Sequence, residues 1–335
     1  MSRADFEQTA KQLEAELGIS AEALLGATVR ARLTDAGMLG HLEDIGSIPD
    51  IDILDAFNPN SIREKGYSTR FRKWRGMVKF RPDELTLWTG YNGHGKTLFL
   101  SQILLDLMED GAKICIASLE MNERRLIHRM FRQASGDVNP PEDYLLAIKR
   151  YYANKFILFK HVGSISQKEI LQDFEIARKY FGVDVFVIDS LMKCGLAEDD
   201  YNEQKRFVDK LCEFKSKFNC HIHLVAHPRK GSDEKGAPGK LDIKGTGTIT
   251  DLADNCFSVW RNKIKEEKIE QNEATVDENS KFDGIIRCNK QRNGEWEGIL
   301  PVWFHKPSMQ YLEYEKAPIH NYVPYSRLDD LRKYL

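Results

Sequence analysis

The stretch from residue 84 to residue 111, ELTLWTGYNGHGKTLFLSQILLDLMEDG, decides the fold. Its apolar opening predicts a short strand, and the segment GYNGHGKT, Gly90 to Thr97, fits the phosphate-binding pattern G-x-x-x-x-G-K-[S/T]. The apolar residues that follow recur at helical spacing as far as Gly111, which predicts a helix that ends there. A strand, a glycine-rich loop and a helix in this order predict a nucleoside triphosphate site, because backbone N–H groups and a helix N-terminus face the phosphates.

Two side chains of this loop have a direct chemical role in the pattern. The Lys96 ammonium would reach the β- and γ-phosphates of ATP or of another nucleoside or deoxynucleoside triphosphate, and the Thr97 hydroxyl would bind Mg²⁺. His94 either lines the phosphates or only fills the loop, and both readings stay open. The remaining predicted nucleotide-binding residues of the segment are Gly90, Tyr91, Asn92, Gly93, Gly95 and Leu98.

Strands and helices alternate along the chain after this unit. Amphipathic stretches predict helices, and they separate short apolar runs that predict strands at 113–120, 156–162, 183–191 and 220–227. The run at 183–191, VDVFVIDSL, is almost continuously apolar, as expected for a central parallel strand that is buried on both faces. Later runs predict strands without long helices between them, at 255–262, 283–292, 299–306 and 309–314. The predicted fold is therefore α/β, with a doubly wound, mostly parallel sheet and antiparallel edge strands.

The sequence predicts three parts of unequal size. Residues 1–60 form a small N-terminal helical segment or linker, residues 61–315 the large α/β domain, and residues 316–335 a C-terminal tail that ends in a helix. Two glycine-rich or charged stretches, 229–247 and 262–282, interrupt the large domain. We expect the stretch 262–282 to be a solvated, mobile loop, because its charges are mixed and it is longer than a simple hairpin needs.

The composition is that of a soluble protein without a global charge bias. Hydrophobic residues make up 41% and charged residues 30% of the chain, and the net charge is −2. Any contact with nucleic acid must therefore come from a local basic patch. The six cysteines form no C-x-x-C pair, which indicates free thiols in a reducing compartment. We expect a cytoplasmic protein, because the N-terminus is polar and no apolar run approaches the roughly 20 residues of a membrane span.

Three polar side chains follow the ends of predicted parallel strands, where a doubly wound sheet binds its ligand. Asp189 suits the Mg²⁺ contact of a Walker B motif, partly through water, but the next residue, Ser190, cannot act as a base. Glu120 is then the predicted general base for the attacking water, and His227 would sense or stabilise the γ-phosphate. The alternatives are structural: a strand-ending aspartate, a helix N-terminal acid and a core histidine.

The segment directly after His227, PRKGSDEKGAPGKLDIKGTG (228–247), combines many glycines with spaced cations. Such a segment suits contact with a nucleic-acid backbone, largely without sequence preference. It has no aromatic residue, so binding would depend on phosphate contacts rather than on base stacking. The alternative is a solvated surface loop. The predicted DNA-binding residues are Arg229, Lys230, Lys235, Lys240 and Lys244.

A family resemblance rests on an ordered set of short motifs. The motifs GYNGHGKT, SLEM, VFVIDS, LVAHPRK, GTGTITDLADN and KQRNGEWEG occur in this order. In order and rough spacing they resemble the DnaB-like replicative DNA helicases, which are RecA-fold ATPases. The likeness is greatest to the helicase domain of phage primase–helicases and to mitochondrial Twinkle, and it covers roughly residues 60–315.

The resemblance implies further site residues. It makes Glu120 the catalytic base and His227 the γ-phosphate sensor, and it pairs Lys290 with Arg292 as a finger that is donated to the nucleotide of the adjacent subunit. A finger in trans requires head-to-tail contacts, which close as a ring. The alternative for this segment is a plain basic hairpin. The resemblance also implies that the nucleotide base stacks between two side chains that could equally be edge-strand residues, Arg261 and Phe304.

The expected function is that of a ring-forming, ATP-driven helicase, hexameric by the resemblance, which moves on single-stranded DNA. Its N-terminal segment is too short for a primase and lacks a zinc-binding cysteine cluster, so a separate primase or polymerase would be its partner. The replication context would be that of a phage, a plasmid, a bacterium or an organelle, with no membrane contact. Two alternatives stay open: a DNA-stimulated ATPase that loads or remodels other proteins without unwinding, and a nucleotide-gated DNA-binding assembly module.

Overall fold

The computed structural model describes residues 45, 48–58, 61, 66–197, 200–227, 247–273 and 275–323. The chain divides into two compact units, Met1–Pro59 and Asn60–Leu335. The described part of the first unit contains one helix, α3 (Asp50–Ala56), which has no buried residue. Most of the predicted N-terminal helical segment, and the helix expected at the end of the C-terminal tail, lie outside the described residues.

The second unit is built on a single nine-stranded sheet with the order β3-β2-β4-β5-β1-β6-β7-β8-β9. The first six strands pair in parallel, and the last three join antiparallel at one edge. The strands are β1 (Leu85–Thr89), β2 (Ile114–Ser118), β3 (Phe156–Leu158), β4 (Val185–Asp189), β5 (His221–Val225), β6 (Asn255–Arg261), β7 (Gly284–Gln291), β8 (Gly298–His305) and β9 (Gln310–Leu312). The predicted mostly parallel sheet with a late antiparallel edge is confirmed.

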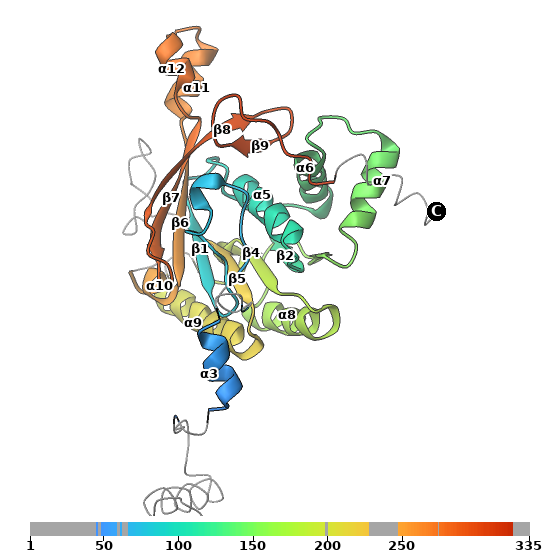
Figure 1. Ribbon diagram of the computed structural model, residues 1–335, viewed down its shortest axis with the longest axis vertical. Coiled ribbons are helices and arrows are strands. Elements are labelled where there is room, and N and C mark those ends of the chain that lie inside the picture. The colour runs from blue at the N-terminus through green and yellow to red at the C-terminus, as the bar shows by residue number, and fades with distance from the viewer. Residues whose placement is uncertain are drawn as a thin grey trace, which may run out of the picture. The chain divides into compact units, whose positions relative to one another are not determined.

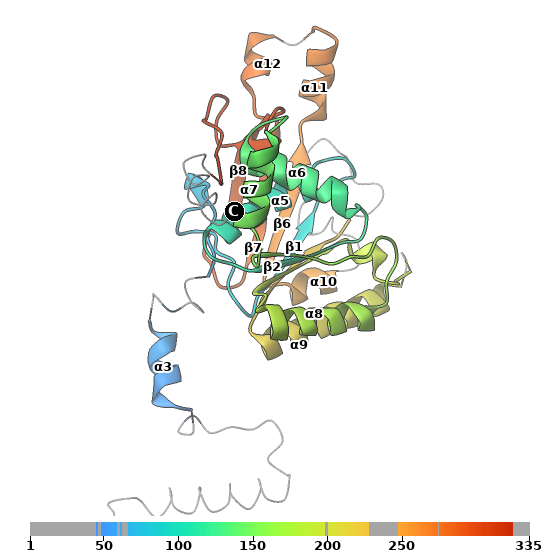
Figure 2. The same ribbon diagram turned by 90° about the vertical axis from the view of Figure 1, so that its right-hand side faces the viewer.

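Helices cover both faces of the sheet (Figure 1). One face carries α5 (Lys96–Glu109), α6 (Glu123–Ser135) and α7 (Glu142–Tyr151), and the other carries α8 (Gln167–Phe181), α9 (Tyr201–Phe218) and α10 (Gly247–Leu252) (Figures 1 and 2). Successive strand residues point to opposite faces, so β4 places Val185 and Val187 in one core and Phe186 and Ile188 in the other. Both faces of the central strands are therefore buried, as the continuous apolar run in β4 predicts.

Local signals in the sequence explain where several helices begin. The Ser166 side chain accepts the backbone N–H of Glu169, whose carboxylate bonds back to Ser166, so α8 starts with a capping box. Asn122 caps α6 by accepting the backbone N–H of Arg125 at 3.0 Å. Lys96 opens α5 directly after Gly95, which has a positive φ of 86°. The phosphate-binding loop therefore ends in a helix N-terminus, as predicted.

The stretch 262–282 differs from the loop that the sequence predicts. It contains α11 (Lys263–Glu270) and α12 (Val276–Ser280), which extend away from the sheet beyond β6 and β7 (Figures 1 and 2). Asn262 caps α11 by accepting the backbone N–H of Lys265 at 3.1 Å, and the buried Lys265 ammonium pairs with Asp283 at 2.7 Å. A capping asparagine before lysine, isoleucine and glutamate favours a helix, so the prediction of a loop is wrong here.

The final described residues pack on the second unit. The Tyr322 hydroxyl donates to Asp106 of α5 at 2.6 Å, and the Tyr144 hydroxyl of α7 donates to the Val323 carbonyl at 2.5 Å. Burial raises the pKa of Asp106 to about 7, against the opposing charge of Arg70. The part of the predicted tail that precedes residue 324 is thus integrated into the α5–α7 face of the domain.

Two general expectations can also be compared with the structure. All six cysteines carry free thiols, and five of them are buried, which confirms the prediction of unpaired thiols. Among the helices that the structure describes, none has the length and apolar character needed to cross a membrane.

Aromatic side chains form the part of the core beneath the phosphate-binding loop. Phe257 of β6 is fully buried and stacks on Trp88 of β1, with ring centroids 4.9 Å apart, and the Trp74 ring centroid lies 5.4 Å from that of Phe257. The Phe99 ring of α5 lies 5.9 Å from Trp88. This cluster fixes α5, and hence the loop before it, against β1.

We expect Phe257→Ala to lower the free energy of unfolding by roughly 3–5 kcal/mol, because it leaves a cavity among these rings. Urea denaturation followed by circular dichroism measures the change. Tyr180→Ala on α8, where the side chain is 79% exposed, is the control and should change the stability by less than about 0.5 kcal/mol. Equal losses in the two variants would contradict the assignment of this core.

Candidate nucleotide-binding site

The carboxyl ends of four neighbouring strands meet at one edge of the sheet. In the order β2-β4-β5-β1, each pair is parallel, and Ser118 of β2 lies opposite Asp189 of β4. Glu120, Asp189, His227 and the phosphate-binding loop follow or end these strands. The structure thus brings together the residues that the sequence places at separate strand ends.

The loop is held closely between β6 and β9. Gly90 has φ 153° and Gly95 has φ 86°, and a Cβ atom at either would collide, with the Val259 carbonyl and the Tyr311 hydroxyl respectively. His94 is buried, and its Nδ1 accepts the backbone N–H of Arg261 at 3.0 Å. These contacts hold the loop against β6 and β9. His94 anchors the loop through its hydrogen bond with Arg261.

Lys96 and Thr97 form the first turn of α5 and point in different directions. The Lys96 ammonium donates to the carbonyls of Gly90 and Tyr91, at 2.6 and 3.1 Å, and burial lowers its pKa. The Thr97 hydroxyl donates to Asp189 Oδ2 at 2.6 Å. Asp189 is 5% exposed, and burial raises its pKa, against the hydrogen bond from Thr97. A cation that approached this pair would meet hard oxygen donors.

This donor set fits Mg²⁺. A hydroxyl and a carboxylate are oxygen ligands, and Mg²⁺ takes one or two protein ligands together with water and phosphate oxygens. Within the described ranges, no group of three or more histidine, cysteine, aspartate or glutamate side chains could form a complete cage for a metal ion. Thr97 and Asp189 are therefore the residues that would hold Mg²⁺ beside a nucleotide.

Glu120 is held from two sides at the rim of the same site. The Ser190 hydroxyl donates to Glu120 Oε1 at 2.6 Å, and His227 Nε2 lies 3.5 Å from the same oxygen. The hydrogen bond with His227 is the main cause that lowers the pKa of Glu120 to about 2, and the Ser190 hydroxyl acts in the same direction. Glu120 is thus ionised near neutral pH, as a proton acceptor must be. Ser190, directly after Asp189, thus positions the acid that follows the neighbouring strand.

Lys290 and Arg292 lie at the opposite end of the sheet from the loop. Gln291 pairs with Asn255 at the start of β6, whereas the loop follows Thr89, which pairs with Ser258 further along β6. Both residues therefore lie away from the phosphate-binding loop of their own chain. The Arg292 side chain is 50% exposed at this edge.

Both side chains hold the C-terminal end of α10 in their own chain. The Lys290 ammonium donates to the carbonyls of Thr250, Asp251 and Ala253, at 2.9, 3.0 and 2.6 Å. Arg292 donates to the Asp251 carbonyl and pairs with Asp254, each at 2.8 Å. Residues 228–246 precede α10 directly, so the predicted finger pair and the predicted DNA-binding segment meet at one helix.

The two predicted base-stacking residues, Arg261 and Phe304, each lie beside a residue that contacts or belongs to the phosphate-binding loop. Arg261 ends β6, where its backbone contacts His94, and its side chain pairs with Glu266 at 2.5 Å. Phe304 lies on β8 and packs on Tyr311 with ring centroids 5.2 Å apart. The five predicted DNA-binding residues, Arg229, Lys230, Lys235, Lys240 and Lys244, lie outside the described residues.

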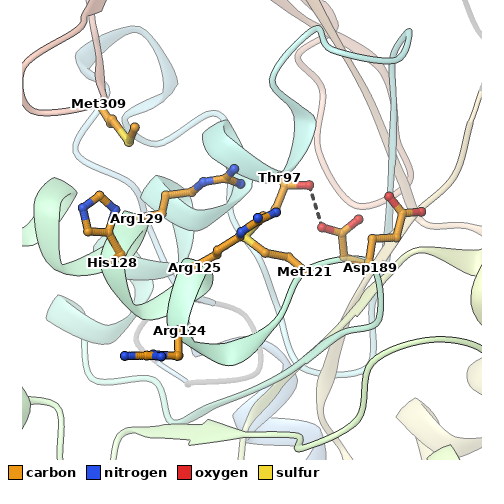
Figure 3. A pocket seen from close by; sticks show the side chains of 9 residues that line it. Thr97, Met121, Arg124, Arg125, His128, Arg129, Asp189 and Met309 are labelled. Atoms are coloured by element: carbon orange, nitrogen blue, oxygen red, sulfur yellow. Dashed lines mark hydrogen bonds between the residues drawn. The ribbon is translucent and has the colours of Figure 1, made fainter.

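The site also contains side chains that the sequence reading omits. A pocket of about 490 Å³ joins Thr97, Glu120 and Asp189 to one face of α6. Its basic lining comes from Arg124, Arg125, His128 and Arg129, and Arg125 and Arg129 extend toward Thr97 (Figure 3). The signal was present as basic residues at helical spacing after SLEM. Tyr311, which packs over Gly95, had no sequence signal because it comes from the distant β9.

Comparisons with known proteins agree with this architecture. A family model described as "AAA domain" matches residues 58–233. The Twinkle homolog protein, chloroplastic/mitochondrial, of Arabidopsis thaliana is 23% identical over 236 residues, which cover 63% of this chain and 33% of that protein. The chain thus spans about a third of the length of this curated relative. The resemblance to DnaB-like helicases that the motifs indicate is confirmed.

Solved structures share the fold. The ATPase domain of G40P aligns with a TM-score of 0.65 and 18% identity, over 81% of this chain and 100% of that chain. A DnaB-like replicative helicase, described together with its interactions with primase, aligns with a TM-score of 0.63 and 15% identity. The alignment covers 92% of this chain and 76% of that chain. A KaiC-like protein from Pyrococcus horikoshii OT3 aligns with a TM-score of 0.51 and 18% identity, over 73% of this chain and 94% of that chain. At these identities the likeness shows the fold, and the RecA-like fold class is confirmed.

We expect Ser190→Ala to raise the pKa of Glu120 above about 2 but to leave it below the ordinary glutamate value of about 4.3, because the contact with His227 remains. A carboxyl group whose pKa is lower in the folded than in the unfolded state stabilises the fold at every pH above its unfolded-state pKa. That stabilisation is lost as the pH falls from the unfolded-state pKa toward the folded-state pKa of about 2. In Ser190→Ala, the pH range over which this stabilisation is lost should therefore be narrower, because the folded-state pKa lies closer to the unfolded-state pKa. A titration of ¹³C-labelled glutamate carboxyl groups by NMR measures the shift.

Ser216→Ala is the matched control, since it removes a hydroxyl that bonds to Asp83 away from the site. It should leave the titration of Glu120 unchanged. An unchanged Glu120 pKa in Ser190→Ala would show that the serine does not hold this carboxylate.

Proposed function

The chain belongs to the AAA domain family, and on that premise we propose that it is an ATP-hydrolysing DNA helicase. In this proposal the subunits form a hexameric ring that moves on single-stranded DNA and unwinds the duplex. ATP or another nucleoside triphosphate is hydrolysed between adjacent subunits. The single observation that carries the proposal is the arrangement of Glu120, ionised and held by Ser190, beside the Thr97–Asp189 pair.

The proposed hydrolysis assigns each residue of this arrangement a step. The loop amides and Lys96 bind the phosphates, and Thr97 and Asp189 hold Mg²⁺, which would neutralise charge on the β- and γ-phosphates. Glu120 orients a water molecule and accepts its proton as the water attacks in line with the γ-phosphate. A mere nucleotide switch needs no such base, which favours an enzyme over an assembly module.

His227 connects the proposed reaction to DNA. It lies 3.5 Å from Glu120 Oε1, and the cation-bearing segment 228–246 follows it directly in the chain. Loss of the terminal phosphate beside Glu120 would therefore act on His227, which directly precedes that segment in the chain. In this proposal its cations contact the phosphate backbone of single-stranded DNA, largely without sequence preference. The cations are Arg229, Lys230, Lys235, Lys240 and Lys244.

The position of Arg292 supports the proposed ring. It is half-exposed at the sheet end opposite the loop, so it suits a role at the site of a neighbouring subunit. Head-to-tail contact of this kind closes as a ring, and an arginine in trans stabilises the charge that develops during phosphoryl transfer. Lys290 would accompany Arg292, and Arg261 and Phe304 would enclose the nucleotide base. A separate primase or polymerase would act with the ring in cytoplasmic or organellar DNA replication.

A mixing experiment tests the shared site. Glu120→Gln and Arg292→Ala should each be nearly inactive alone, because the first lacks the base and the second lacks the finger. Mixed in equal amounts, they should recover activity, since about a quarter of randomly formed head-to-tail interfaces combine an intact base with an intact finger. ATP turnover and strand displacement on a forked duplex are measured at each mixing ratio.

The control is a mixture of Glu120→Gln with Lys96→Ala. Both changes lie in the same half of the site, so every interface is defective and no mixing ratio should recover turnover. Recovery in neither mixture would contradict catalysis in trans. DNA-stimulated turnover without strand displacement in the wild type would instead favour an ATPase that loads or remodels other proteins.

A further inference from the structure

Arg129 of α6 has no counter-ion among the residues that the structure describes. Its side chain is partly buried in the 490 Å³ pocket and extends toward Thr97 (Figure 3). Among the described residues it makes no hydrogen bond and no ion pair. Arg132, one turn further along α6, is different, because its guanidinium donates to the carbonyls of Pro307 and Lys306, at 2.6 and 2.9 Å. Arg132 is thus bonded within the fold, whereas Arg129 is bonded to none of the described residues.

The nearby carboxylates, Asp189 and Glu120, make no ion pair with Arg129 in the described part of the chain, and each is bonded to another side chain. Asp189 accepts the Thr97 hydroxyl, and Glu120 accepts the Ser190 hydroxyl and contacts His227. Burial lowers the pKa of Arg129, and the charge of Asp189 only opposes that effect. A guanidinium that is partly removed from water and left unpaired is unfavourable, so the fold retains it at a cost in stability.

The surroundings of Arg129 indicate which anion would pair with it. The pocket also contains Thr97, which would hold Mg²⁺, and Glu120, which would orient the attacking water. The group between these two in the proposed reaction is the terminal phosphate of the triphosphate. A planar guanidinium can donate two parallel hydrogen bonds to phosphate oxygens, and such charge-assisted bonds are among the strongest in proteins.

We propose that Arg129 binds the terminal phosphate of the nucleotide from within its own subunit and thereby distinguishes triphosphate from diphosphate. The inference rests on the proposed function and adds a specificity-determining residue to it. It differs from the part assigned to Arg292, since Arg129 acts at the site of its own chain and before subunits associate. Arg125, one turn earlier on the same face, extends the positive surface toward the same point.

The test compares binding of a non-hydrolysable ATP analogue with binding of ADP, each in the presence of Mg²⁺, by equilibrium titration of the full chain. Arg129→Gln should weaken binding of the analogue about 10- to 100-fold, as the loss of hydrogen bonds from a charged group does, and should change ADP binding less than about twofold. Arg129→Lys should recover part of the loss, because it retains the charge without the planar fork.

Thermal unfolding without nucleotide separates this role from a structural one. Arg129→Gln should leave the melting temperature unchanged or raise it, since it removes an unpaired charge. Arg132→Gln is the matched control on the same helix. It should lower the melting temperature, because two carbonyls lose their donor, and should leave the ratio of analogue to ADP affinity unchanged.

Equal losses of analogue and ADP binding in Arg129→Gln, or a lowered melting temperature without a change in the affinity ratio, would overturn the inference. Wild-type protein that binds the analogue more tightly than ADP through Arg129, yet neither hydrolyses ATP nor displaces a strand, would support the inference and overturn the proposed function alone. Wild-type protein that binds no triphosphate would overturn both.

Discussion

The hydrogen bond from the Thr97 hydroxyl to Asp189 is the contact on which the rest of the site depends. It joins the first turn of α5 to the end of β4 at 2.6 Å, across the intervening strand β5. The bond is possible because parallel pairing aligns the carboxyl ends of β1, β5 and β4 at one edge. The same alignment brings Glu120 from β2 to within reach of Ser190 and His227. One constraint of register thus assembles phosphate, metal and base positions from four segments that are distant in the sequence.

The sequence was sufficient wherever position on a strand determined position in space. Asp189, Glu120 and His227 each follow an apolar run, so their convergence could be predicted without coordinates. Ser190 could be recognised as no base, but its contact with Glu120 depends on which strand lies beside β4. Whether the Arg129 side chain faces the pocket depends on how α6 is rotated about its axis, and composition alone does not determine that rotation. The α11 helix has a mixed charge pattern that resembles that of a solvated loop, and its start depends on the Asn262 cap.

The opposite end of the sheet has its own organisation, and α10 lies at its centre. Lys290 and Arg292 bind the last carbonyls of that helix, and Arg292 also pairs with the buried Asp254. Residues 228–246 lead directly into the other end of the helix. If Arg292 turns to a neighbour's phosphates, it must release this helix, so the interface and the proposed DNA-binding segment would respond together. The sequence did not indicate this contact, because it joins residues about 40 positions apart.

In the proposed mechanism a competent site needs two subunits, one with the loop and Glu120 and the other with Arg292. The most direct measurement is native mass spectrometry at rising protein concentration, with Mg²⁺, a nucleotide analogue and single-stranded DNA, beside ATP turnover per subunit in matched samples. Turnover per subunit should rise in step with the formation of a closed ring. A chain that remains monomeric and hydrolyses ATP at the same rate per subunit at every concentration would contradict it.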